Sequence, residues 1–144
     1  MTTDLSLRVT RFFAATPERV FDAWLDPAKL VLFITPDPTL AAPDVTVDPA
    51  EGGRFDIIMK GTNRDLPHWG VYREIRRPEK LVFTWESEFS IAGSTVTLTL
   101  EPEGDGTRLT LTHEHFSSEE IRDNHEEGWS MITDHLAKVV EGVD

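Results

Sequence analysis

The sequence predicts an α+β fold in which a curved antiparallel sheet of about seven strands wraps around one long C-terminal helix. Three observations lead to this prediction. Seven segments alternate between apolar and polar residues, which is the period of a β-strand. After the first of them, two short segments each begin with a capping residue and a proline, as helices do. The last apolar pattern, over residues 117–142, has the spacing of a single long helix.

Composition limits the classes of function. The 144 residues fit one domain spanning 1–144, and 39% apolar residues suffice for a core. The chain has no cysteine, which excludes disulfides and thiolate chemistry. A net charge of −12 disfavours binding to nucleic acid or anionic lipid. Neither a membrane-spanning apolar run nor a signal-peptide pattern is present, so we expect no membrane insertion and a cytoplasmic protein.

The first strand and the two short helices are predicted from residue 5 onward. Residues 5–13 alternate and end in two phenylalanines. Thr16 followed by Pro17, and Asp26 followed by Pro27, predict the starts of two helices. The prolines at 36 and 38 are expected to end the second one. The apolar faces of these helices comprise Val20, Phe21, Trp24, Leu30, Phe33 and Ile34.

Six further strands are predicted before the long helix. They cover residues 44–48, 54–60, 69–75, 81–85, 96–100 and 109–115. In the last two strands threonines alternate with leucine or valine, which predicts a sheet with one solvated and one buried face. In the strand at 69–75, strict alternation puts Trp69 and Arg73 inside and Tyr72 outside.

The long helix is predicted to run from Ser117 to Gly142. Ser117 and Glu120 have the spacing of a capping box, and Gly142 can supply a left-handed stop. The apolar face of the helix comprises Ile121, Gly128, Trp129, Ile132, Leu136, Val139 and Val140. This face is expected to cover the apolar side of the sheet.

A curved sheet around one helix rarely closes completely, so we predict a cavity between the sheet, the long helix and the two short ones. Apolar and aromatic walls with a few polar groups are typical of small-molecule sites. The predicted ligand-binding residues are Trp24, Phe33, Phe55, Ile57, Trp69, Arg73, Phe83, Trp85, His113, Trp129 and Ile132. For each aromatic residue, simple core packing is the alternative.

His113 and His115 are the sharpest polar feature of the predicted interior. His113 could anchor a ligand, form part of a metal site with His115, or be a core histidine whose hydrogen bonds are satisfied within the protein. No third metal ligand has a recognisable placement, so we predict no metal and no cofactor. Arg73 could hold a ligand carboxylate or pair with an internal glutamate, or a bulge could turn it outward.

Known catalytic motifs are absent from the sequence. The chain contains no Gly-x-Ser-x-Gly turn, no phosphate-binding glycine loop and no His-Glu-x-x-His helix. Acid–base chemistry by His113 remains open.

Five segments in a fixed order resemble a known family. They are Ala15–Trp24 with Asp26-Pro27, Gly52–Phe55, Gly70–Tyr72 with Arg77–Trp85, Gly106–His113, and Gly128–Leu136. Together they resemble the family of heat-shock-protein-90 ATPase activator homologues, within the helix-grip superfamily of START-like lipid carriers, pollen-allergen-type proteins and polyketide cyclases. The sequence departs from the family pattern at Phe33, which stands where a tryptophan is usual. That departure would reshape the cavity mouth.

The resemblance implies a helix-grip fold and a hydrophobic-ligand cavity, but no single reaction. Our leading hypothesis is therefore a protein that binds a small hydrophobic or aromatic molecule. One alternative is a polyketide cyclase-like enzyme that uses His113. Another is a stress-related or co-chaperone-like module with a protein partner. Co-chaperone activity belongs to larger proteins that carry such a domain with a second one, so it is not transferred.

Overall fold

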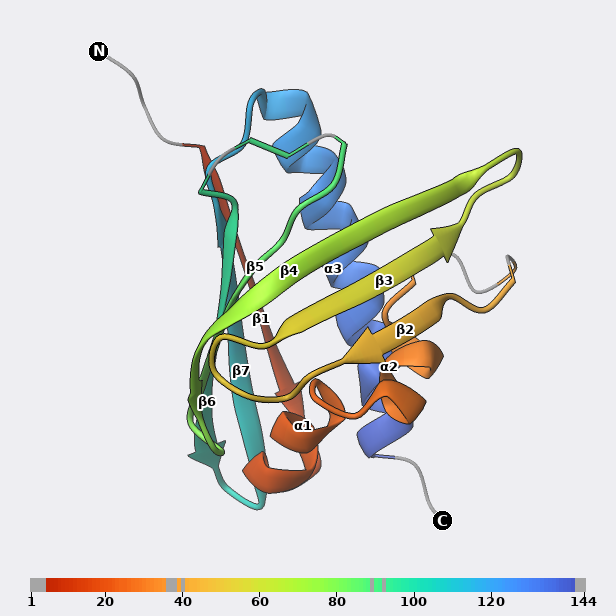
Figure 1. The fold of residues 1–144 in the computed structure, drawn as a ribbon. Helices are drawn as coiled ribbons and strands as arrows, with labels where there is room; N and C mark the ends of the chain where they lie inside the picture. The colour runs from red at the N-terminus through yellow and green to blue at the C-terminus, as the bar shows by residue number, and fades with distance from the viewer. Residues whose placement is uncertain (1–4, 36–38, 40, 89, 92, 142–144) are drawn as a thin grey trace.

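The computed structural model describes residues 5–35, 39, 41–88, 90–91 and 93–141. The strands are β1 (Ser6–Phe13), β2 (Asp44–Val47), β3 (Arg54–Lys60), β4 (Asp65–Arg76), β5 (Lys80–Thr84), β6 (Thr95–Glu103) and β7 (Gly106–Glu114), and the helices are α1 (Pro17–Ala23), α2 (Pro27–Phe33) and α3 (Glu119–Val140). The strands form one antiparallel sheet in the order β1-β7-β6-β5-β4-β3-β2, and α3 lies in its curve (Figure 1). The predicted helix-grip fold is confirmed.

The two short helices begin where the sequence predicts. The hydroxyl of Thr16 accepts a hydrogen bond from the backbone N–H of Arg19 at 3.2 Å, which caps α1. The carboxylate of Asp26 accepts one from the N–H of Ala28 at 2.9 Å, which caps α2. The prolines expected to end α2 lie outside the described residues.

The threonine-rich strands have the predicted two faces. In the pairing of β6 with β7, Thr97 lies opposite Thr112, and Thr99 lies opposite Thr110. These threonines are only partly buried, whereas Leu98 and Leu111, paired on the other face, are fully buried. The buried face continues the core that the helices cover.

Strand β4 contains a bulge at Arg73, which is one of the alternatives that the sequence left open for this residue. The register with β5 shifts between Tyr72 and Glu74, so one residue is unpaired. A one-residue shift exchanges the faces of a strand. Before the bulge, Tyr72 therefore points into the core and is buried. The predicted inward orientation of Trp69 and Arg73 is wrong, because Trp69 pairs with the outward-facing Asp56 and Arg73 is exposed.

The first half of β4 and its partner β3 form an arm, and β2 pairs with the other edge of β3. Strand β5 pairs with β4 only from Tyr72 onward, while β3 pairs with β4 from Asp65 to Val71. This arm extends past the end of β5 (Figure 1). One edge of β4 is thus open near Pro67, a position where a residue without an N–H is tolerated.

The long helix α3 begins one residue later than predicted. Its N-cap is Ser118, whose hydroxyl accepts from the N–H of Ile121 at 3.2 Å, so the predicted capping box from Ser117 to Glu120 is wrong. Gly142, the predicted stop, lies outside the described residues. The buried side chains of α3 include Trp129, Ile132, Leu136 and Val140, as predicted. Among the described residues, no helix combines the length and apolarity needed to cross a membrane.

Replacing Gly70 by alanine is expected to destabilise the protein by about 3 kcal/mol, because the new methyl group would overlap its neighbours. A Cβ at this position would lie 1.9 Å from the backbone oxygen of Thr84 and 2.6 Å from the ring of Phe55. Denaturant unfolding measures the change.

A suitable control is Gly104→Ala, since a Cβ there meets nothing within 4 Å and only its φ of +57° is unfavourable. That variant should lose about 1 kcal/mol. Equal losses in the two variants would contradict the close approach at Gly70.

Candidate functional site

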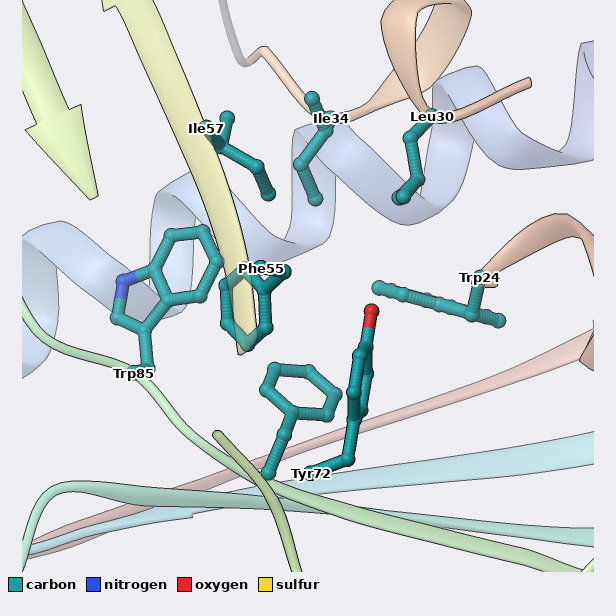
Figure 2. A pocket seen from close by; sticks show the side chains of 8 residues that line it. Trp24, Leu30, Ile34, Phe55, Ile57, Tyr72 and Trp85 are labelled. Atoms are coloured by element: carbon teal, nitrogen blue, oxygen red, sulfur yellow. The ribbon is translucent and has the colours of Figure 1, made fainter. Parts of the chain in front are cut away.

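Two hollows lie between the sheet and the helices, and Trp85 lines both. The first, which we call the inner cavity, has a volume of about 10 Å³ and is lined by Trp24, Leu30, Ile34, Phe55, Ile57, Tyr72, Phe83 and Trp85 (Figure 2). The second, which we call the cleft, has a volume of about 170 Å³ and is lined by Met59, His68, Trp85, Asn124, His125, Gly128, Trp129 and Ile132. The inner cavity has room for one water-sized group. The cleft has room for an aromatic ring system.

The cleft is formed by the β3–β4 arm on one side and by α3 on the other. Its α3 residues are spaced so that they fall on one helix face. Gly128 contributes no side chain at the centre of this face, which leaves the space open. Met59 and His68 come from the arm. The Trp85 and Trp129 rings meet edge to face at the back of the cleft, with their centroids 4.9 Å apart.

The cleft contains two neutral imidazoles. His68 Nδ1 lies 3.0 Å from the Leu66 carbonyl oxygen, and His125 Nδ1 lies 2.8 Å from the Ile121 carbonyl oxygen. A carbonyl only accepts, so each Nδ1 carries the proton and each Nε2 keeps a lone pair. Burial lowers the pKa of His68 to about 4 and also lowers the pKa of His125. Near neutral pH both rings can therefore accept a hydrogen bond.

The inner cavity is walled by aromatic rings. Phe55 contacts Tyr72, Phe83 and Trp85 with ring centroids 5.4, 5.5 and 6.1 Å away, respectively. Figure 2 shows the Tyr72 hydroxyl directed into the cavity, on the side of Trp24. Burial raises the Tyr72 pKa, so the hydroxyl stays protonated.

His113 lies behind the cleft and is fully buried. The indole N–H of Trp129 donates to His113 Nδ1 at 3.1 Å. The proton of His113 must then be on Nε2, which lies 2.8 Å from the Ser94 hydroxyl oxygen. Burial and the nearby His125 lower the pKa of His113 to about 3. Of the three readings open from the sequence, this arrangement is that of a core histidine with both nitrogens hydrogen-bonded.

The structure brings most of the predicted site residues together, in two groups. Trp24, Phe55, Ile57, Phe83 and Trp85 line the inner cavity, while Trp85, Trp129 and Ile132 line the cleft. Phe33 is buried and packs edge-on against Trp24, with 5.1 Å between the ring centroids, but it lines neither hollow. Trp69, Arg73 and His113 also lie outside both. Direct contact of any of these residues with a ligand stays a prediction.

Sequence reasoning missed the polar groups of both hollows. Helical spacing could have found His125, because it lies four residues before Trp129 on the same face of α3. Alternation alone could not have found His68 and Tyr72, because the bulge in β4 reverses their orientation relative to the later part of the strand. Within the part of the chain that the structure describes, no three histidine, aspartate or glutamate side chains are grouped to hold a metal ion.

Comparison with known proteins identifies relatives of the whole described fold. A family model described as "Activator of Hsp90 ATPase homolog 1-like protein" matches residues 14–141. No curated protein sequence matches the chain significantly.

Solved structures with the same fold come from several bacteria. Protein CV1439 from Chromobacterium violaceum is 26% identical with a TM-score of 0.81, and the match covers 96% of this chain and 98% of that one. CalU16 from Micromonospora echinospora is 27% identical with a TM-score of 0.73, covering 95% of this chain and 76% of that one. A protein from Rhizobium leguminosarum is 21% identical with a TM-score of 0.84, covering 96% and 95%.

The buried His113 predicts a specific acid sensitivity. Its pKa in the folded protein, about 3, lies below the usual value of 6.5, so the unfolded chain binds the proton first as the pH falls. The stability that the neutral ring contributes is complete above about pH 6.5 and declines as the pH falls toward the folded-state value.

Between pH 8 and pH 5 the parent protein should therefore lose about 2 kcal/mol more stability than the His113→Gln variant, which has no titrating group at this position. Urea unfolding at several pH values measures the difference. An identical pH dependence in the two proteins would show that His113 is protonated as readily in the folded state as in the unfolded one.

Proposed function

The chain belongs to the family of Activator of Hsp90 ATPase homolog 1-like proteins, and from this membership and the geometry of the cleft we propose that it binds a small hydrophobic or aromatic molecule between the sheet and α3. The observation that carries the proposal is the cleft of about 170 Å³, which has tryptophan rings at its back and two neutral imidazoles among its walls. Such a combination of apolar walls and few polar groups is typical of small-molecule sites.

Hydrophobic burial would supply most of the binding energy. A bicyclic aromatic molecule that buries about 200 Å² gains about 5 kcal/mol at 25 cal/mol per Å². The loss of translational freedom and the ordering of side chains oppose this gain. We therefore expect dissociation constants in the range of about 10 µM to 1 mM for simple aromatic probes.

The polar groups of the cleft would fix the orientation of the ligand rather than its affinity. With Nδ1 of His68 and of His125 protonated against backbone carbonyls, the Nε2 lone pairs suit a hydroxyl or amine donor on the ligand. A carboxylate would find no cation in this lining. The exposed Arg73 lies outside both hollows, so its placement does not support the predicted carboxylate-binding role.

The placement of His113 does not favour the alternative of a polyketide cyclase-like enzyme that uses this residue. A general base needs a nitrogen within reach of the substrate, and both nitrogens of His113 are hydrogen-bonded within the core. The alternative of a protein-interaction module has weaker support than ligand binding. The large apolar side chains exposed among the described residues come from four different segments: Phe12, Leu32, Ile91 and Met131.

Filling the cleft should abolish binding without unfolding the protein. In Gly128→Leu the new side chain would occupy the centre of the cleft, while the helix gains about 1 kcal/mol of propensity. We expect the affinity for the neutral fluorescent probe N-phenyl-1-naphthylamine to fall by a factor of at least about 10, as a lost contact of this size implies. Fluorescence titration measures the change.

The matched control is Ser130→Leu, which adds the same side chain at an exposed position of the same helix. It should bind the probe as the parent does. Equal binding by Gly128→Leu and the parent would show that the probe lies elsewhere. Absence of binding to the parent would refute the proposed function for ligands of this class.

A further inference from the structure

We propose that the inner cavity recognises a hydrogen-bond acceptor, the carbonyl or ether oxygen of an uncharged ligand, through the Tyr72 hydroxyl and the Trp24 indole N–H. The inference rests on the proposed function and specifies the chemical class of the ligand. Neither Tyr72 nor Trp24 lines the cleft, so their contribution can be tested separately from binding in the cleft.

The first observation concerns two donor groups of the inner cavity, of which the Trp24 N–H is fully buried without an acceptor among the described residues. Trp24 is 3% exposed, and its buried Nε1 has no hydrogen-bond partner among the described residues. Tyr72 is also 3% exposed, and no described residue bonds to its hydroxyl. Figure 2 shows this hydroxyl directed into the cavity that Trp24 also lines. Leaving the buried Trp24 N–H unpaired is unfavourable, and phenylalanine at this position would avoid the cost.

The second observation is that comparable polar groups nearby are satisfied. The Trp129 N–H donates to His113, and the hydroxyl of Thr107 donates to the Ala15 carbonyl oxygen at 2.8 Å. The hydroxyl of Thr133 donates to the Trp129 carbonyl oxygen at 2.9 Å. The described core therefore pairs these donors. Of the two buried side-chain atoms that lack a partner among the described residues, Trp24 Nε1 belongs to a residue of the inner cavity, and Arg11 Nε does not.

The chemistry of the two donors specifies the ligand group. An indole N–H can only donate, and a tyrosine held protonated by burial can donate. Both therefore suit an acceptor oxygen. The lining contains no lysine or arginine, and the negative charge of Asp48 acts on Tyr72. An anionic ligand group would be repelled there, so the acceptor should be neutral.

The size of the cavity agrees with this assignment. A volume of about 10 Å³ accommodates one oxygen-sized group but no ring. The ring of the ligand would reach the oxygen site from the cleft, and the Trp85 side chain lines both spaces. Among the described residues the Trp85 indole has aromatic contacts but no hydrogen-bond partner, so turning it aside breaks no polar contact.

The test compares two probes that differ in one atom. In 2-isopropenylnaphthalene a CH₂ group replaces the carbonyl oxygen of 2-acetylnaphthalene, while the shape is nearly unchanged. The affinity of each is measured by calorimetry, or by displacement of N-phenyl-1-naphthylamine, for the parent and for Tyr72→Phe. In Tyr72→Phe the affinity for the ketone should fall about five- to tenfold relative to the affinity for the alkene, as expected for the loss of one buried hydrogen bond. Trp24→Phe should shift this relative affinity in the same direction.

A measurement of thermal stability without any probe provides an independent test. Because the Tyr72 hydroxyl has no partner in the free protein, Tyr72→Phe should unfold at the same temperature as the parent or at a higher one. The matched control is Ser94→Ala, which removes a buried hydroxyl that is paired with His113. That variant should unfold at a lower temperature and should leave the ratio of probe affinities unchanged.

The outcomes separate this inference from the proposed function. If both probes bind and Tyr72→Phe leaves the ratio of their affinities unchanged, Tyr72 does not bind the carbonyl oxygen. The inference is then overturned, while the proposed ligand binding stands. If Tyr72→Phe destabilises the free protein as much as Ser94→Ala, the hydroxyl has a partner within the protein and the inference is overturned. If neither probe binds the parent, both proposals fail.

Discussion

The hydrogen bond from the Trp129 indole to His113 is the directional constraint on which the geometry of the site depends. Apolar packing between a helix and a sheet does not by itself fix how far the helix slides or turns. This bond links α3 to β7, and His113 extends the link to Ser94, just before β6. With Trp129 held, its ring meets Trp85 and approaches Trp24, with 6.4 Å between the Trp24 and Trp129 centroids. The hydrogen bond thereby fixes the position of the tryptophan rings at the back of the cleft.

The elements that depend on local pattern were predictable. The seven strands follow from alternation, and the starts of α1 and α2 follow from a capping side chain before a proline. The errors occur where the pairing between strands determines which face of the sheet a side chain points to. The composition of β4 does not show where the bulge lies, yet the bulge reverses which side chains point into the core. As a result Tyr72 points inward, while Trp69 and Arg73 lie outside the core.

The candidate site was predictable only in its apolar part. Large aromatic residues on inward faces meet somewhere in the core of any such fold, and five of the predicted residues line the inner cavity. The state of a histidine depends instead on the partners that the fold places around it. His113 became a core group because Trp129 and Ser94 use both of its nitrogens. In His68 and His125 a backbone carbonyl lies against Nδ1, which places the proton on that nitrogen and leaves the lone pair on Nε2.

The pairing of β1 with β7 also has a consequence for how the chain reaches this structure. These strands are neighbours in the sheet but lie about a hundred residues apart in the sequence. Bringing them together costs the conformational entropy of the long intervening segment before the contacts between the strands can form. During synthesis, β7 and α3 become available only after the six preceding strands have been made, and until then α3 does not cover the apolar face of those strands. Cooperative folding of this domain must therefore wait until β7 and α3 have been synthesised.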